Sequence, residues 1–368
     1  MRVLVVNAGS SSLKLRVLGP GDEAETAHDI ADWDAANEAT DVRDLLGTLA
    51  PVDAVGHRVV HGGSRFHSAE RVDAAVEREI EALIPLAPLH QPRALAGIRL
   101  LSRLQPGVPQ IACFDTAFHA TLPAAAATYA LPADWRARWD LRRFGFHGLS
   151  HAYASRRAAE LVDRAGDPGL RVVSCHIGAG ASLCASRGGR SVDTTMGFTP
   201  LEGLVMATRS GTVDPGLVLW LLQHGGLAIE DVARALESGS GLAGLSGVPG
   251  GDMREVIARR AGGDAAAVLA FDAYVHRLRR ELGSMVAVLG GVDVLVFAGG
   301  VGEHAPAVRA AACEAFEFAG VTLDATRNLS ASGDGDIGAV GASARSLVVT
   351  AREDIEIAGQ VRALLGVT

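Results

Sequence analysis

The first eighteen residues contain two runs of apolar side chains separated by a polar turn. Residues 2–7 are rich in β-branched apolar side chains, residues 8–12 (AGSSS) interrupt them, and residues 13–18 alternate apolar with basic side chains. This pattern predicts two strands joined by a turn. It returns in residues 171–190 (RVVSCHIGAGASLCASRGGR). The chain is therefore expected to repeat one folding unit.

A third strand with a glycine-rich end is predicted in residues 292–306 (VDVLVFAGGVGEHAP), followed by an alanine-rich helix over 308–319. Between the strands, apolar residues at helical spacing predict amphipathic helices over residues 72–86, 149–165, 215–223 and 265–289. Strands that alternate with helices indicate the α/β class. At 368 residues the chain is long enough for two domains.

Composition excludes some classes of partner. The net charge is −8 and the pI is about 5.8, so no basic stripe is expected for nucleic acid or an anionic membrane. Residues 284–302 carry Asp293 and five glycines, which argues against a membrane span. No signal peptide is recognised at the start of the sequence. Cys113, Cys175, Cys184 and Cys313 lack CxxC spacing, which predicts buried free thiols, a reducing compartment and a cytoplasmic location.

The glycine-rich turns indicate phosphate binding. Small side chains leave backbone N–H groups accessible to an anion. None of the turns matches a P-loop or a GxGxxG sequence that opens a helix, so neither nucleotide motif is supported. Lys14, the only lysine in the chain, follows the first turn and suits a phosphate contact. Each turn taken alone is more readily interpreted as an ordinary hairpin.

Seven motifs keep the order that is found in one known family. They are NAGSSSLK (7–14), GHRVVHGG (56–63), APLHQP (87–92), FDTAFHATLP (114–123), RRFGFHGLSH (142–151), DTTMGFTPLEGLVMATRSG (193–211) and FAGGVGEH (297–304). Together they resemble the acetate kinase family. The resemblance implies two ribonuclease-H-like domains, a duplicated actin-like ATPase fold that flanks an active-site cleft, and a homodimer. It places the N-terminal domain at residues 1–118 plus 354–368 and the C-terminal domain at residues 119–353.

The implied activity is a reversible, Mg²⁺-dependent transfer of the ATP γ-phosphoryl group to acetate, which gives acetyl phosphate and ADP; Mn²⁺ is an alternative metal. A propionate or butyrate kinase of the same fold remains open, because one methylene in an apolar pocket changes binding by only ~1–3 kcal/mol. A nucleotide-binding regulatory or chaperone-like protein with decayed catalysis is the alternative from another class. Pyrophosphate as the phosphoryl donor is not excluded.

The resemblance assigns roles to individual residues. Arg58 and Arg209 match the arginines that hold the transferred phosphoryl group, His147 matches the transition-state histidine, and Asp115 matches an acidic residue of the same site. Asn7 and Glu353 match metal-site residues. The acid-binding residues are Arg58, Val60, Leu89, Phe146 and Pro200. The nucleotide-binding residues are Ser10, Ser12, Lys14, His176, Gly178, Ala179, Gly180, Asp252, Arg254, Gly300, Val301 and Gly302.

Each of these residues also has a purely structural interpretation. The arginines could form surface ion pairs, His147 could be a core histidine, Asp115 could cap a helix, and the pocket residues could be ordinary core. Three positions depart from the family motifs: Ala179, Gln91 and His304 each stand where asparagine is usual. The chain is also shorter than is typical, with the deficit around residues 22–52.

Overall fold

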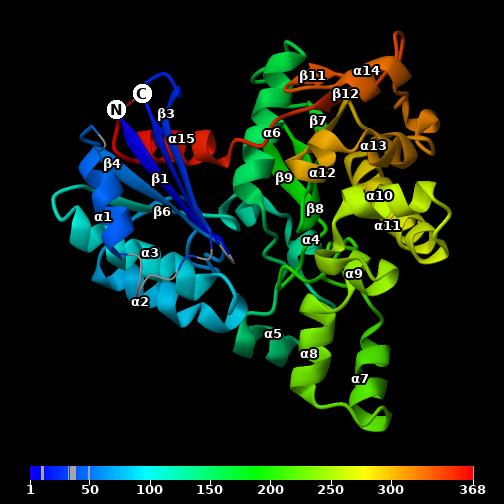
Figure 1. The fold of residues 1–368 in the computed structure, drawn as a ribbon, viewed down its shortest axis with the longest axis horizontal. Helices are drawn as coiled ribbons and strands as arrows, with labels where there is room; N and C mark the ends of the chain where they lie inside the picture. The colour runs from blue at the N-terminus through cyan, green and yellow to red at the C-terminus, as the bar shows by residue number, and fades with distance from the viewer. Residues whose placement is uncertain (10–11, 32, 34–38, 49, 368) are drawn as a thin grey trace. The chain divides into compact units, whose positions relative to one another are not determined.

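The computed structural model describes residues 1–9, 12–31, 33, 39–48 and 50–367, and it divides into two compact units (Figure 1). Unit 1 comprises Met1–Ala120, Phe146–Tyr153 and Arg352–Thr368, and unit 2 comprises Thr121–Gly145 and Ala154–Ala351. The short segment around His147 thus belongs to unit 1. The domain borders given by the resemblance stay predictions.

Unit 1 contains a six-stranded sheet in the order β3-β2-β1-β4-β6-β5. Its strands are β1 (Val3–Ala8), β2 (Ser12–Leu18), β3 (Ala24–Ala31), β4 (Ala54–Val59), β5 (Glu70–Arg71) and β6 (Gln110–Phe114). β1, β4 and β6 are parallel to one another. β2 pairs antiparallel with β1, β5 pairs antiparallel with β6, and β3 pairs antiparallel with β2. The helices of this unit are α1 (Ala39–Thr48), α2 (Ala74–Ala82), α3 (Gln91–Leu104) and α15 (Glu353–Leu364), with 3₁₀ turns at Ile84–Leu86 and Ala117–Thr121.

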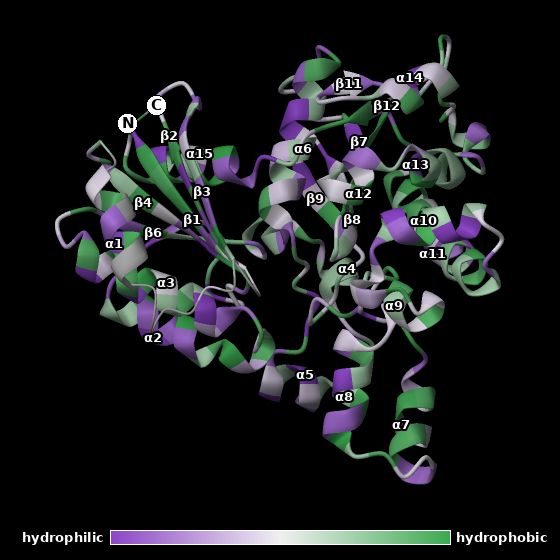
Figure 2. Ribbon diagram, viewed as in Figure 1, coloured by the Kyte–Doolittle hydropathy of each residue, from purple (hydrophilic) through white to green (hydrophobic). Residues whose placement is uncertain are grey.

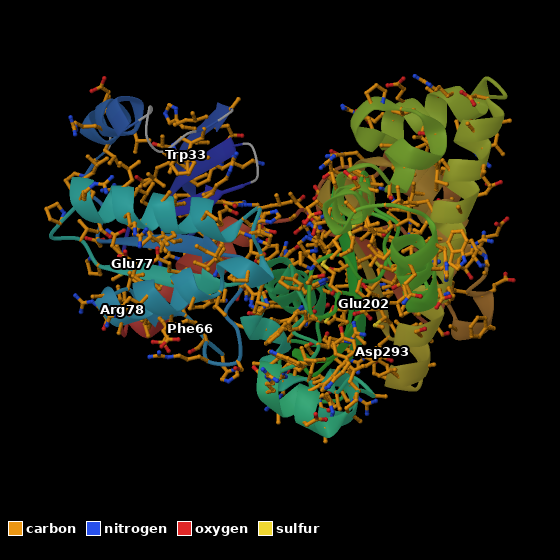
Figure 3. All side chains as sticks on the ribbon, turned by 90° about the horizontal axis from the view of Figure 1, so that it is seen from below. Trp33, Phe66, Glu77, Arg78, Glu202 and Asp293 are labelled. Atoms are coloured by element: carbon orange, nitrogen blue, oxygen red, sulfur yellow. The ribbon has the colours of Figure 1, made fainter. Side chains whose placement is uncertain are left out.

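The central strands β1 and β6 are buried on both faces, which explains why they are almost wholly apolar, whereas the edge strand β3 is mainly exposed. Alternate residues of β1 face opposite sides: Val3 and Val5 pack against α15, whereas Leu4 and Val6 join a cluster with α3. Green strands in Figure 2 show this apolar character. Phe66, labelled in Figure 3, stacks on another ring of this unit in a third apolar cluster.

Unit 2 contains the strands β7 (Arg171–Ile177), β8 (Ala181–Arg187), β9 (Arg190–Thr194), β10 (Val294–Ala298), β11 (Gly335–Asp336) and β12 (Arg345–Val348). Its longer helices are α6 (Gly148–Leu161, which begins in unit 1), α7 (Pro215–His224), α8 (Ile229–Ser238), α10 (Met253–Ala261) and α11 (Ala265–Leu289). The shorter helices are α4 (Ala124–Ala127), α5 (Ala133–Trp139), α9 (Gly241–Ser246), α12 (Gly299–His304), α13 (Pro306–Cys313) and α14 (Ala325–Ser330).

The sheet of unit 2 has the order β9-β8-β7-β10-β12-β11, which matches the order in unit 1 strand for strand. β7, β10 and β12 are parallel to one another. β8 pairs antiparallel with β7, β11 pairs antiparallel with β12, and β9 pairs antiparallel with β8. The predicted α/β class and the predicted repeat of one folding unit are confirmed.

Most predicted elements are present, but several helices end earlier than expected. The helix predicted over 72–86 is α2, which ends at Ala82, and the helix predicted over 149–165 is α6, which ends at Leu161. The helix predicted over 265–289 is α11, with the same bounds. The helix predicted over 308–319 is wrong at its end, because α13 stops at Cys313. The backbone leaves the helical region at Phe316 and turns this ring into the core. All four cysteines are free and buried, as predicted. Among the helices described, none has the length and apolarity that a membrane crossing requires.

Candidate active site

In unit 1, three of the predicted residues lie at the carboxyl ends of adjacent parallel strands. Asn7 is the next-to-last residue of β1, Arg58 is the next-to-last residue of β4, and Asp115 directly follows β6. Glu353 is the first residue of α15. Since ligands of open α/β sheets bind beyond the carboxyl ends of the strands, this edge is the expected position for a site.

Arg58 connects the acidic residues of this edge. Its Nε lies 3.1 Å from both carboxylate oxygens of Asp115, and its Nη2 donates to Asp115 Oδ2 at 2.7 Å. Its Nη1 lies 3.2 Å from Glu353 Oε2, which also accepts from Asn7 Nδ2 at 3.4 Å. Burial raises the pKa of the Asp115 carboxyl group to about 6, although the positive charge of Arg58 acts in the opposite direction. Asp115 therefore serves to hold the arginine, and its oxygens are occupied by the guanidinium.

His147 is held in a strained conformation beside this group. Its φ of 55° is in the left-handed region, where a side chain with a Cβ is rare. The next residue, Gly148, donates its N–H to Asp115 O at 2.9 Å, and a Cβ there would lie 2.1 Å from that oxygen. On the other side, His119 Nε2 lies 3.0 Å from Phe146 O. The backbone around His147 is thus fixed on both sides, as is common at functional sites.

The predicted acid-binding residues differ in burial. Phe146 is buried, with its ring edge-on to His61 at 5.3 Å, whereas Val60 is half-buried and Leu89 is 52% exposed. Gln91, one of the departures from the family motif, is fully buried. Its side-chain amide accepts from His61 N at 3.2 Å and donates to His61 O at 2.8 Å. Glutamine therefore anchors the loop that follows β4.

In unit 2, Arg209 lies in a loop with mainly neutral contacts. Its Nη1 donates to Pro200 O at 3.1 Å and lies 3.6 Å from Met206 Sδ. Burial lowers the pKa of its guanidinium. Within the described part of the chain, no carboxylate forms an ion pair with it. A desolvated cation of this kind is suited to an anionic ligand.

The same loop contacts the second glycine-rich turn. Ala207 donates its N–H to Ala179 O at 3.0 Å, between β7 and β8. A cavity of about 640 Å³ opens beside this turn. Its walls are Gly178, Ala179, Asp252, Met253, Arg254, Ile257, Gly300, Val301, His304, Ala305, Pro306 and Ala307. Most of the nucleotide-binding residues predicted in unit 2 thus line one cavity.

The remaining predicted nucleotide-binding residues lie as follows. Ser10 lies outside the described residues, and Ser12 begins β2, where its side chain is not described. Lys14 is exposed and pairs with Asn7 across the β1–β2 ladder. His176 and Gly302 flank the cavity on β7 and α12. Asp252 caps α10 and pairs with Arg254, which lowers the pKa of its carboxyl group to about 2.

Two residues that support the cavity were not predicted. Arg309 is 1% exposed, and its Nη1 donates to the carbonyls of Gly302 and Glu303 at 2.9 and 2.7 Å, at the end of α12. Glu303 Oε1 accepts from Gly299 N and Ala351 N, both at 3.0 Å. Arg309 lies outside the seven motifs and Glu303 lies inside the motif FAGGVGEH, but only tertiary contacts identify their supporting role.

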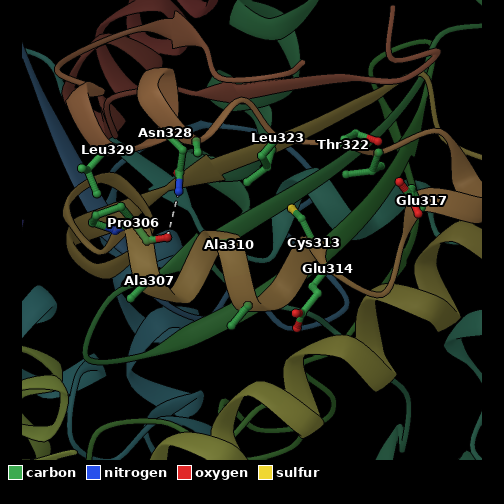
Figure 4. A pocket seen from close by; sticks show the side chains of 13 residues that line it. Pro306, Ala307, Ala310, Cys313, Glu314, Glu317, Thr322, Leu323, Asn328 and Leu329 are labelled. Carbon is green, nitrogen blue, oxygen red and sulfur yellow. Dashed lines mark hydrogen bonds between the residues drawn. The ribbon is translucent and has the colours of Figure 1, made fainter. Parts of the chain in front are cut away.

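Beside α13, a second hollow of about 770 Å³ lies between that helix and α14 (Figure 4). Asn328 donates to Pro306 O at 3.0 Å across its wall. Its lining is mainly alanine, valine and leucine with two glutamates. None of the predicted site residues lines this hollow, which shares Pro306 and Ala307 with the wall of the first cavity.

Comparison with known proteins decides the family. The family model described as the acetokinase family matches residues 42–359. The chain belongs to the acetokinase family. An acetate kinase from a Synechococcus strain is 45% identical over 99% of each chain. The crystal structure of Porphyromonas gingivalis acetate kinase is 35% identical with a TM-score of 0.90 over 99% of each chain. A propionate kinase from Francisella tularensis is 33% identical with a TM-score of 0.90 over 98% of each chain.

Membership of the acetokinase family confirms the predicted resemblance, the predicted fold and the predicted reaction class. The chain is a phosphotransferase whose acceptor is a carboxyl group. The duplicated α/β units carry the two groups of side chains described above, one on each sheet edge.

Proposed function

We propose that this acetokinase-family chain transfers the γ-phosphoryl group of ATP to acetate. A carboxylate oxygen of acetate attacks the γ-phosphorus, the bond to the β–γ bridging oxygen breaks, and acetyl phosphate and ADP result. This chemistry needs in-line positioning and positive charge around the equatorial oxygens more than covalent help from the protein. The reaction is reversible, since both directions use the same groups.

The observation that carries this proposal is the contrast between the two arginines. Arg58 is oriented by two carboxylates, whereas Arg209 is largely buried with neutral contacts. Following the family resemblance, we assign Arg209 of unit 2 and Arg58 of unit 1 to phosphoryl oxygens, which a forked guanidinium binds two at a time. His147 donates from its ring to the same group.

The side chains of unit 1 fit a divalent metal. Mg²⁺ prefers oxygen ligands and is commonly held by one or two carboxylates together with substrate phosphates and water. Glu353 and Asn7 supply a carboxylate and an amide at one edge, while Asp115 is occupied by Arg58. Among the described residues no group of three or more His, Cys, Asp and Glu side chains forms a separate metal site. When bound, Mg²⁺ or Mn²⁺ would neutralise charge on the phosphate oxygens.

The substrate is tested by an acyl-hydroxamate assay with formate, acetate, propionate and butyrate, each with ATP and with pyrophosphate. We expect the highest kcat/KM with ATP and acetate. A maximum with propionate would favour the second candidate function, a propionate kinase. The similarity to the propionate kinase from Francisella tularensis is the observation that supports this candidate. Faster phosphorylation of a sugar or glycerol would overturn the proposal. ATP hydrolysis without any acid dependence would favour a regulatory protein with decayed catalysis.

We also propose that the chain forms a homodimer whose interface covers α7. The sequence of this helix is PGLVLWLLQH, yet none of its residues is buried, and Leu219 and Trp220 are 56% and 55% exposed. Figure 2 shows the helix mainly in green. An apolar helix of this kind is typical of an interface between subunits. Light scattering after size-exclusion chromatography is expected to give a dimer, and Trp220→Glu is expected to give a monomer; a wild-type monomer would refute this.

A cytoplasmic location is proposed for the same chain. Its four buried cysteines are free thiols, which is the usual state in a reducing compartment.

A further inference from the structure

Three polar side chains of unit 2 form a cluster that no step of the proposed reaction uses. Tyr129 donates its hydroxyl hydrogen to Glu202 Oε2 at 2.5 Å, and Arg143 Nη2 donates to Glu202 Oε1 at 2.6 Å. The Arg143 guanidinium lies over the Tyr129 ring, 5.6 Å from its centroid. Each member of this Tyr129 cluster therefore contacts the other two. Glu202 is labelled in Figure 3.

The Arg143 side chain reaches the start of the loop 194–202, which follows β9. Its Nη1 lies 3.3, 3.2 and 2.9 Å from the carbonyl oxygens of Thr194, Thr195 and Met196. Only 17% of this side chain is exposed, so the guanidinium is held among these acceptors and Glu202. One planar group thus fixes three successive peptide units at the start of the loop.

The middle of the loop is held by the tyrosine. Phe198 donates its N–H to Tyr129 Oη at 2.9 Å. The residue before it must be glycine, because a Cβ on Gly197 would lie 1.6 Å from Glu202 Oε2 and 2.2 Å from Tyr129 Oη. The loop therefore packs directly on the hydrogen bond between Tyr129 and Glu202, with no room for a side chain between them.

The loop also contacts two parts of the proposed site. Pro200 O accepts from Arg209 Nη1 at 3.1 Å. Gly197 O accepts from the N–H groups of Phe144 and Gly145 at 3.0 and 3.2 Å, directly before Phe146 in sequence. A shift of the loop would consequently move the backbone that orients Arg209 and the segment that leads to Phe146.

We propose that the Tyr129 cluster is a set of positioning residues for the loop 194–202, and that it sets the affinity of the enzyme for its carboxylic acid. This rests on the proposed function, in which Pro200, Phe146 and Arg209 serve the acid and the phosphoryl group. The nucleotide cavity has none of the cluster residues in its wall, so its affinity for ATP is expected to be independent of the cluster.

The test uses Tyr129→Phe and Glu202→Gln in the full-length enzyme, with Tyr274→Phe as the matched control. Tyr274 is buried in unit 2, and its hydroxyl has no hydrogen-bond partner among the described residues. Removal of the Tyr129 hydroxyl leaves both Phe198 N–H and Glu202 Oε2 without this partner. We expect the KM for acetate to rise about tenfold in each variant, the effect of losing one hydrogen bond to a charged group, with the KM for ATP within about twofold of wild type.

A cycle of the two single variants and the double variant shows whether the residues act together. The double variant is expected to raise the acetate KM by less than the product of the two single effects. Both changes weaken the hydrogen bond between Tyr129 and Glu202, and Glu202→Gln also weakens the ion pair with Arg143. Additive effects, an unchanged acetate KM in Tyr129→Phe, or equal changes in the two KM values would each overturn the proposal. If Glu202→Gln does not fold, the acetate KM of Tyr129→Phe alone tests the proposal.

Hydrogen exchange separates this proposal from the proposed function. Tyr129→Phe is expected to increase deuterium uptake in peptides that cover the loop 194–202, whereas Tyr274→Phe is not. This readout requires no substrate. A wild-type enzyme that is inactive with every carboxylic acid would refute the proposed function. Unchanged hydrogen exchange in the loop of Tyr129→Phe would refute the positioning role, whatever the activity.

Discussion

Arg58→Lys tests whether the fork of the guanidinium, rather than its charge, matters in unit 1. The arginine contacts both oxygens of Asp115 and one oxygen of Glu353. A lysine keeps the positive charge but has a single nitrogen, which cannot bind Asp115 through two atoms and reach Glu353 at the same time. We therefore expect the variant to lose both stability and turnover.

The structure gives the size of each loss. Asp115 is 1% exposed, so breaking its ion pair completely would cost ~3–5 kcal/mol of unfolding free energy. Lysine retains part of the pair and loses at least one hydrogen bond between charged groups, so we expect about 2 kcal/mol. Loss of one donor to the transferred phosphoryl group is expected to lower kcat by a further factor of about a hundred, or about 3 kcal/mol.

Urea unfolding and initial rates of acyl phosphate formation measure the two effects. The matched control is Arg16→Lys, in the same sheet, whose partner Asp29 is 54% exposed at a distance of 2.6 Å. An exposed pair of this kind is worth no more than about 1 kcal/mol, and we expect unchanged turnover. Wild-type stability and turnover in Arg58→Lys would show that the forked geometry has no role.

Three further predictions concern single residues of the two units. Burial lowers the pKa of His57 from 6.5 to about 4, so the unfolded chain binds more protons than the folded chain between these pH values. The unfolding free energy is therefore expected to fall by up to about 3 kcal/mol as the pH drops from 6.5 towards 4. Urea unfolding at several pH values should show no such fall in His57→Gln. Arg309→Met is expected to lower the unfolding free energy by about 3 kcal/mol and to raise the KM for ATP but not for acetate, because the arginine holds the end of α12 through two carbonyl groups. Equal changes in both KM values would contradict this supporting role. Ala179→Asn is expected to raise kcat/KM for ATP about tenfold or more with little change in the acetate KM, because Ala179 is exposed in the wall of the nucleotide cavity; lower activity with ATP would contradict this.

Local sequence pattern was sufficient for much of the fold. Central strands buried on both faces are almost continuously apolar, so β1 and β7 were recognisable, and their similar glycine-rich turns indicated the repeat that the matching strand orders confirm. Helix α11 was predicted with its observed bounds because its apolar residues keep helical spacing throughout. The end of α13 was missed because the chain leaves the helix after Cys313 and buries Phe316 outside it, which helical spacing alone does not show.

The candidate site was predictable only where motifs identify it. Arg58, Asp115 and Glu353 lie together in unit 1, far apart in sequence, as the resemblance implied. Their supporting residues carried no such signal. Gln91 was a departure from the motif, and only the structure shows its amide bound to the His61 backbone. Arg309 was not distinguished from the other arginines, because no sequence motif indicates that its side chain is buried.

The central claim is that the chain moves a phosphoryl group between a nucleotide and a short carboxylic acid. It is tested most directly by ATP formation from acetyl phosphate and ADP with Mg²⁺, followed with a coupled luminescence assay in the wild type and in Arg209→Lys. We predict ATP formation by the wild type and a rate about a hundredfold lower in the variant, because lysine loses the two-pronged contact with the phosphoryl oxygens. The claim would be contradicted by a wild-type protein that forms no ATP from acetyl phosphate, whereas equal rates in the two proteins would contradict the role proposed for Arg209.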